Sequence, residues 1–220
     1  MEIPSSTLAA DRLIPLGAFH LACLSQTAAL SDLHDAFAPV QAELEGAAEN
    51  RLSALKALIP VRVTIRFAER GVERALRGLN AGAVALDGKA GGPIQDSLFP
   101  NGLNAETRPR TAKQVDAAQR VLNRLHTASP AEPLRASHEE ALIRSTNALS
   151  LALDARKAAY QNLGVAIAAE LASRDDFVRA YDANAGAIRQ RFPKDRETQD
   201  LYFDAVSSRK AEDAEEEGAL

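Results

Sequence analysis

The most regular hydrophobic pattern in the chain starts at Leu30 and repeats every seven residues. Eight of the nine positions in this series are apolar, and a second series three residues further on is apolar or small throughout. The two series are Leu30, Phe37, Leu44, Arg51, Leu58, Ile65, Val72, Leu79 and Leu86, and Leu33, Val40, Ala47, Ala54, Val61, Ala68, Ala75 and Gly82. Paired series at heptad spacing predict a long helix over 30–86 whose seam packs against another helix.

Two prolines interrupt this segment, at positions 39 and 60. A proline inside a helix removes a backbone hydrogen bond and costs about 3 kcal/mol. We therefore expect a break near Pro60, which leaves open one long helix or a helix pair. The run 61–67 alternates as a strand does, but the heptad series continues through it and no second run offers a pairing strand, so we favour a helix.

A second apolar row appears beyond Leu58, formed by Ile59, Val63 and Phe67 at intervals of four. A helix that is apolar on two sides is normally covered on two sides. We therefore expect 61–86 to be central in a helical bundle.

The rest of the chain follows the same helical pattern. Residues 87–110 are rich in turn-forming Gly and Pro and are expected to form a loop that docks its apolar residues on the bundle. Helices are expected at 111–127, 134–191 and 195–206, with a helical part in 8–28 that starts near Pro15. The acidic segment 207–220 is expected to be disordered. The loop's apolar residues are Ile94, Leu98, Phe99 and Leu103.

These elements predict an all-α protein, an elongated antiparallel helical bundle forming a single domain over 1–206. The tetrapeptide Asn-Ala-Gly-Ala occurs at 80–83 and again at 184–187. The same offset of 104 residues places the Ile59 row on Leu163, Ile167 and Leu171. Either an internal duplication or chance similarity between two Ala-rich helices explains this echo.

Composition supports the all-α class and argues against several kinds of protein, including nucleic-acid-binding and membrane-spanning ones. Only 5% of residues are aromatic and there is no Trp, whereas a β-sandwich needs more aromatic and β-branched residues. A net charge of −4 does not favour nucleic-acid binding. The single cysteine, Cys23, excludes an intramolecular disulfide, and the most apolar early stretch, 13–30, is too polar for a membrane span. We therefore expect a cytoplasmic protein.

The motifs that suggest enzyme chemistry are incomplete. The segment 82–89 resembles a phosphate-binding loop, but five residues separate its glycines instead of four and Ala90 replaces the magnesium-binding Ser or Thr. No histidine has a Glu three residues before it, as a di-iron bundle requires. His20 and Cys23 are close enough on a helix to touch, but a buried inert cysteine is commoner. We expect no enzyme activity, cofactor or metal.

Charged residues offer two candidate sites. The first is a ridge of arginines formed by Arg62, Arg66, Arg70, Arg74 and Arg77. Such a ridge suits an acidic protein segment, although Glu69 and Glu73 are spaced to neutralise it and a simple solvated face is the commoner arrangement. We expect no aromatic side chain to interleave the ridge and stack bases, so nucleic acid is the less favoured partner.

The second candidate is a pair of charges, Arg51 and Glu170, each of which interrupts an apolar row. Arg51 lies 35 residues before Leu86, and Glu170 lies 36 residues after Leu134. If the long helices are antiparallel with Leu86 level with Leu134, the two charges meet and fix the register.

We interpret the chain as a non-catalytic helical scaffold or protein-interaction protein that acts through its long seams, with a protein partner or self-association. The alternative is a small-molecule or lipid-binding bundle in which the 87–110 loop closes an apolar pocket.

Overall fold

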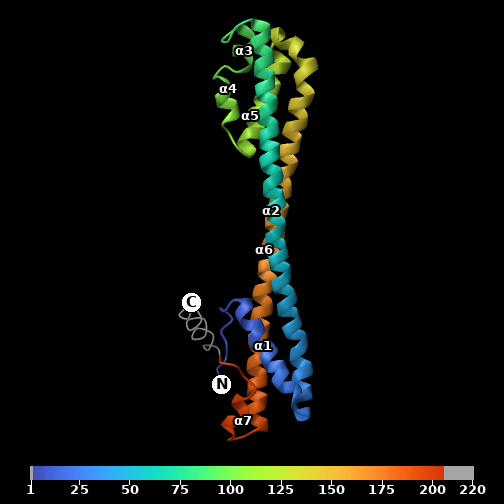
Figure 1. Cartoon of the computed structure of the whole chain (residues 1–220), viewed down its shortest axis with the longest axis vertical. Helices are drawn as coiled ribbons and strands as arrows, with labels where there is room; N and C mark the ends of the chain where they lie inside the picture. The colour runs from blue at the N-terminus through green and yellow to red at the C-terminus, as the bar shows by residue number, and fades with distance from the viewer. Residues whose placement is uncertain (1, 206–220) are drawn as a thin grey trace, which may run out of the picture. The chain divides into compact units, whose positions relative to one another are not determined.

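The computed structural model describes residues 2–205, so the predicted acidic tail lies outside the described residues. Every regular element within them is helical, which confirms the predicted all-α class (Figure 1). The α-helices are α1 Ala10–Ser25, α2 Ser31–Asp87, α3 Pro93–Leu98, α4 Leu103–Thr107, α5 Ala112–Thr127, α6 Glu132–Arg191 and α7 Arg196–Asp200. Short 3-10 turns, Ala28–Leu30 and Ser129–Ala131, precede α2 and α6.

The two long helices have 57 and 60 residues, and α2 continues without a break through both of its prolines. The expected break at Pro60 is therefore wrong. Pro39 and Pro60 are both exposed, while Leu58 and Ile65 on either side of Pro60 are buried. The burial of these flanking residues offsets the lost hydrogen bond.

The chain contacts divide into two compact units. Unit 1 consists of residues 1–55 and 162–220, and unit 2 consists of residues 56–161. Each long helix therefore contributes one segment to each unit.

In unit 1, α1 packs with the first segment of α2 and the last segment of α6 around an aromatic core. Helix α1 begins before Pro15, at Ala10, and α7 is shorter than the predicted helix at 195–206. The chain turns after α7, so that Tyr202 and Phe203 return to the core. The large side chains of this core include Leu13, Leu24, Leu30, Phe37, Leu44, Phe177, Tyr181 and Ile188.

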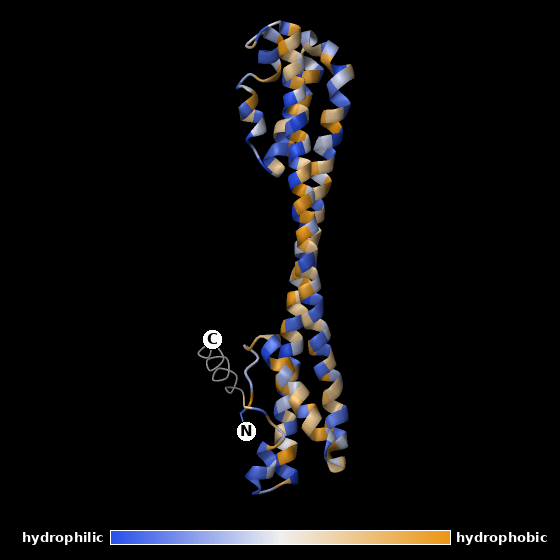
Figure 2. Ribbon diagram, in the orientation of Figure 1, coloured by the Kyte–Doolittle hydropathy of each residue, from blue (hydrophilic) through white to orange (hydrophobic). Residues whose placement is uncertain are grey.

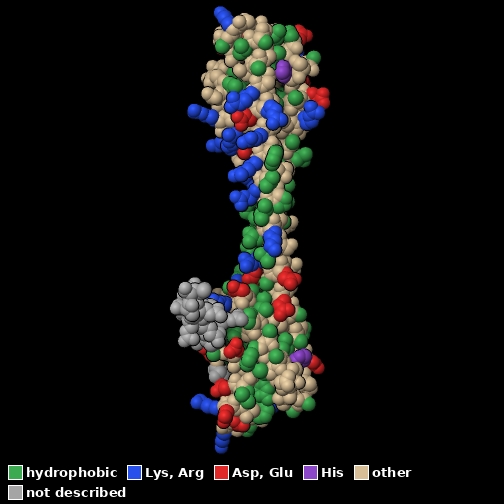
Figure 3. All heavy atoms as spheres, viewed as in Figure 1, with side chains coloured by type: hydrophobic (Ala, Val, Ile, Leu, Met, Phe, Trp, Pro, Cys, Tyr) green, Lys and Arg blue, Asp and Glu red, His purple; other side chains and the backbone are tan. Residues whose placement is uncertain are grey.

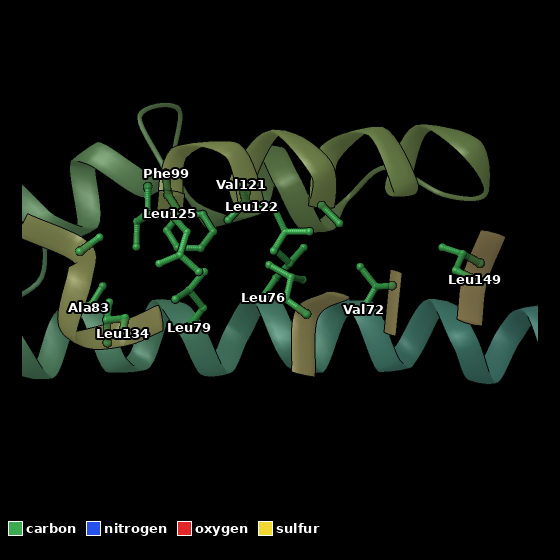
Figure 4. Close-up of a cluster of buried hydrophobic side chains, with 14 of the residues drawn as sticks. Val72, Leu76, Leu79, Ala83, Phe99, Val121, Leu122, Leu125, Leu134 and Leu149 are labelled. Carbon is green, nitrogen blue, oxygen red and sulfur yellow. The ribbon is translucent and has the colours of Figure 1, made fainter. Parts of the chain in front are cut away.

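In unit 2, α5 packs along the second segment of α2 and the first segment of α6. Figure 4 shows Leu76 and Leu79 of α2 directed toward Leu122 and Leu125 of α5. The predicted loop at 87–110 contains α3 and α4, and it docks its apolar residues on the bundle as expected, with Leu98 and Phe99 almost fully buried.

Within the described residues, no helix has an apolar stretch of the length and hydropathy that crossing a bilayer requires.

Candidate interaction surface

The row formed by Ile59, Val63 and Phe67 lies on the exposed side of α2 in unit 2, and we call it the apolar row. The three side chains are 60%, 47% and 74% exposed, respectively. Side chains two positions apart in a helix point about 200° away from each other. Val63 therefore lies nearly opposite Ile65, which is buried in the core. The apolar row therefore does not contribute to the core of unit 2.

The expectation that 61–86 is covered on two sides is wrong for this row. Helix α5 starts beside Glu69, whose carboxylate accepts a 2.8 Å hydrogen bond from the backbone N–H of Thr111. The apolar row precedes that level, so α5 leaves it exposed. Hydrophobic residues recur along this part of α2 (Figure 2).

The five predicted arginines of the ridge are all exposed on α2. Four of them, together with Glu69, Glu73 and Arg110, line an open groove. The loop arginine Arg110 is a member of this surface that sequence reasoning missed, because its position depends on how the loop returns to α5. Figure 3 shows Lys and Arg side chains gathered over this part of unit 2. We call the five arginines of α2 the Arg ridge.

The two glutamates of the groove are already engaged within unit 2. Glu73 accepts hydrogen bonds from Nε and Nη2 of Arg77, at 3.0 and 2.8 Å, and lies 3.7 Å from Arg110. The hydrogen bonds from Arg77 are the main reason that the pKa of Glu73 is lowered. The Glu69 carboxylate accepts from the Thr111 backbone and forms no ion pair with a ridge arginine among the described residues, which differs from the pairing that the sequence pattern suggested.

The remaining ridge arginines are Arg62, Arg66, Arg70 and Arg74. Their side chains form no hydrogen bond or ion pair with any residue that the structure describes. Unit 2 has 16 basic and 10 acidic residues, a formal net charge of +6. The outer face of α2, meaning the apolar row together with the Arg ridge, is thus a hydrophobic strip beside a net positive charge, in which Arg77 is paired with Glu73 and Arg70 also helps to lower the pKa of Glu73. Phe67 also places an aromatic ring beside the ridge, which differs from the sequence expectation.

The second candidate site, Arg51 and Glu170, lies in unit 1. The structure brings these two side chains together as an ion pair, with Glu170 buried and Arg51 exposed. The other carboxylate oxygen lies 3.7 Å from Arg174, whose Nη1 donates to the Leu8 carbonyl at 2.9 Å. The contacts link α2, α6 and the segment before α1, which is a structural role.

A buried carboxylate in unit 2, Glu106 of α4, was not identified from the sequence. It accepts hydrogen bonds from Arg120 at 3.0 Å and Arg124 at 2.7 Å, and Arg124 also donates to the Leu98 carbonyl. The two arginines lie four apart on α5, so they share a helix face. The spacing of the two arginines can be read from the sequence. The acid that they bind cannot, because it comes from α4 in the 87–110 segment. The cluster holds α4 against α5.

The histidine and cysteine of α1 do not form a nucleophilic pair. The Nδ1–H of His20 donates to the Tyr202 carbonyl at 2.8 Å, and the Asn184 amide donates to Nε2 at 3.0 Å. Both ring nitrogens are therefore engaged away from Cys23. Burial raises the pKa of the Cys23 thiol and the carboxylate of Asp204 raises it further, so the reactive thiolate is disfavoured.

The glycine-rich segment at 82–89 ends α2. Helix α2 continues to Asp87, and Gly88 follows with a φ of 69°, a conformation that favours glycine. The Asp87 carboxylate then accepts from the backbone N–H groups of Ile94 and Gln95 in α3. No group of three or more His, Cys, Asp or Glu side chains suited to holding a metal occurs among residues 2–205.

The chain was compared with protein-family models, curated proteins and solved structures, and none of these comparisons finds a match. The outer face of α2 is therefore the candidate functional site.

Proposed function

We propose that this chain is a non-catalytic helical scaffold or interaction protein that binds a protein partner on the outer face of α2 in unit 2. The observation that carries the proposal is the exposure of Phe67, Val63 and Ile59 in one continuous row. Single exposed hydrophobic residues are ordinary, but an exposed apolar patch with a polar rim is typical of protein-binding surfaces. The Arg ridge supplies that rim.

Most of the heptad seam is buried in the core of the chain itself, as the burial of Leu58, Ile65, Val72 and Leu79 shows. A partner helix that packs on α2 therefore has to use the outer row. An amphipathic partner helix docks through apolar residues three, four and seven positions apart, and the residues of the apolar row, four apart, can meet such anchors.

The chemistry of the face indicates the kind of partner. Four arginines that form no hydrogen bond or ion pair with a described residue favour acidic side chains, because Arg binds carboxylates with paired hydrogen bonds. The aliphatic residues Ile59 and Val63 favour an apolar helix face over stacked bases. The expected partner is therefore an amphipathic helix with an acidic flank.

The alternative of a pocket under the 87–110 loop has less support. Leu98 and Phe99 of that loop are buried in the same cluster as Val121 and Leu125, and Figure 4 shows Phe99 beside Leu125. We therefore base the proposal on the outer face of α2.

Site-specific photo-cross-linking in the cells that make the protein tests this proposal. A photoreactive residue at Val63 should give a discrete covalent product that survives nuclease treatment. The matched control is Ser150, an exposed position on α6 of the same unit, which should give no such product. Phe67→Glu should reduce the Val63 product at least tenfold while leaving the helical circular dichroism signal unchanged. No product at Val63, or the same product at Ser150, would contradict the proposal.

A further inference from the structure

Unit 1 has a surface that matches the outer face of α2 with the opposite charge. On α6, the exposed residues Ile167 and Leu171 are followed on the same helix face by the exposed acids Asp175 and Asp182. The intervals of four, four and seven keep these four residues within one side of a helix. We call these four residues the acidic face of α6.

The two acids of this face are not engaged within the chain. Neither Asp175 nor Asp182 forms an ion pair or a side-chain hydrogen bond with another described residue. Unit 1 as a whole has 10 basic and 20 acidic residues, a formal net charge of −10, against +6 for unit 2. Opposite charges on two faces favour and orient their association.

The apolar residues of the two faces have the same spacing. Val63 and Phe67 are four apart on α2, and Ile167 and Leu171 are four apart on α6. If an α2 helix and an α6 helix from two copies lie side by side in the same direction, an offset of 104 residues places Val63 beside Ile167 and Phe67 beside Leu171. This is the same offset that relates the two Asn-Ala-Gly-Ala sequences.

The charges then fall into register as well. At this offset Asp175 is level with position 71, between Arg70 and Arg74, and Asp182 is level with position 78, next to Arg77. Positions 71 and 78 are both glycines, and a Cβ atom there would lie 3.7 Å from Ser145 and 4.0 Å from His138 of the same chain, so the side chains that meet the acids are those of the neighbouring arginines. The acidic face therefore offers both the apolar anchors and the carboxylates that the outer face of α2 requires.

We propose that the partner is a second copy of this chain, and that the outer face of α2 in one copy binds the acidic face of α6 in the other. The inference rests on the proposed function and names its partner. The proposed association is two-fold, so that α2 of each copy meets α6 of the other and the assembly closes at two chains.

Molar mass in solution tests the inference. The purified full-length chain should have a two-chain mass by size-exclusion chromatography with light scattering, and should dissociate as salt is raised. Arg70→Glu with Arg74→Glu should weaken association at least tenfold, and so should Asp175→Arg with Asp182→Arg. All four positions are exposed, so the unfolding midpoint of each variant should stay close to that of the wild type.

Mixing the two charge-reversed variants distinguishes a specific contact between these faces from an effect of the protein's net charge on association. Mixing the two charge-reversed variants should restore the two-chain mass, because each reversed face meets its reversed complement. The control is Arg144→Glu with Lys157→Glu, which makes the same change of charge at exposed positions of α6 in unit 2 and should leave the association unchanged.

A single-chain mass for the wild type, or a two-chain mass that persists in both charge-reversed variants, overturns the inference. Failure to restore the two-chain mass on mixing overturns it as well. The inference can fail while the proposed function holds. If the purified protein is a single chain but Val63 still gives a specific product in cells, the partner is another protein and not a second copy.

Discussion

Arg51 of α2 and Glu170 of α6 form an ion pair in unit 1, in which the Glu170 side chain is 5% exposed and the Arg51 side chain is 47% exposed. Each residue interrupts an apolar row of its own helix, and the contact places the two interruptions at the same level. A buried carboxylate without a cation is strongly unfavourable, so registers that separate the two residues are disfavoured.

Charge reversal tests this role. Arg51→Glu should destabilise the protein by about 1–3 kcal/mol, because it places two carboxylates together, while water around Arg51 keeps the loss below that of a fully buried pair. Glu170→Arg should also destabilise, and the double variant should recover much of the loss in urea unfolding. As a control, Arg144→Glu disrupts an exposed pair with Glu140 and should change little. Additive losses in the double variant would show that the pair does not set the register.

The buried Glu106 of unit 2 should contribute to stability through its two arginines. Glu106→Gln removes the charge and keeps the size of the side chain, so we expect a loss of about 1.5–3 kcal/mol, the range for hydrogen bonds to charged groups. Glu140→Gln, at an exposed position, should change the free energy of unfolding by less than about 0.5 kcal/mol. Equal effects of the two substitutions in chemical unfolding would mean that the cluster is not stabilising.

Close packing at Gly17 of α1 gives a prediction with a matched control in the same unit. A Cβ atom at Gly17 would lie 2.6 Å from the buried ring of Phe177 and even closer to Gln41. Gly17→Ala should therefore cost about 1–3 kcal/mol. At Gly46 of α2 a Cβ atom meets nothing within 4 Å, so Gly46→Ala should stabilise the helix by about 0.5–1 kcal/mol. Thermal unfolding that shifts in the same direction for both variants would contradict this packing.

Stability should depend on pH through His20. Burial lowers the pKa of His20 below 6.5 in the folded protein, and the hydrogen bond to the Tyr202 carbonyl offsets part of this effect. The unfolded chain therefore takes up the proton first, so stability is complete above about pH 6.5 and falls as the pH is lowered toward the folded pKa, by at most about 1.4 kcal/mol per pH unit. Protonation also gives Nε2 a hydrogen directed at the Asn184 amide donor.

Urea unfolding at pH 7.5 and pH 5.5 measures this effect. His20→Gln should lose stability at pH 7.5 and show a smaller difference between the two pH values than the wild type. A pH dependence that is unchanged in His20→Gln would assign it to another group.

The long helices could be predicted from the sequence because the heptad series extends over many turns and outweighs local signals. The same series led to the Arg51–Glu170 alignment, since antiparallel helices of known rise leave an uncertainty of about one turn. Gly82, the last member of the second heptad series, lies against α6. A Cβ atom there would lie 2.7 Å from Nε2 of His138 and 3.0 Å from Leu134 on α6.

The features that sequence reasoning missed depend on tertiary contacts. The local penalty at Pro60 suggested a break, but the buried residues on either side keep α2 continuous. The exposure of Phe67 depends on where α5 begins along α2, which the sequence pattern does not specify. Glu106 meets its arginines only because the loop folds back onto α5.

Disulfide trapping between two copies measures directly whether the outer face of α2 lies against the acidic face of α6 of a second copy. In a Cys23→Ser background, a chain with Val63→Cys is mixed with a chain with Ile167→Cys and oxidised mildly. A disulfide requires Cα atoms about 4.4–6.8 Å apart, a distance that facing positions on packed helices reach. We predict a covalent two-chain product from the mixture, little product from either variant alone, and none when Ser150→Cys replaces Ile167→Cys. A mixture that gives no more two-chain product than its separate components would show that the two faces do not meet and that the partner of the outer face of α2 is not a second copy.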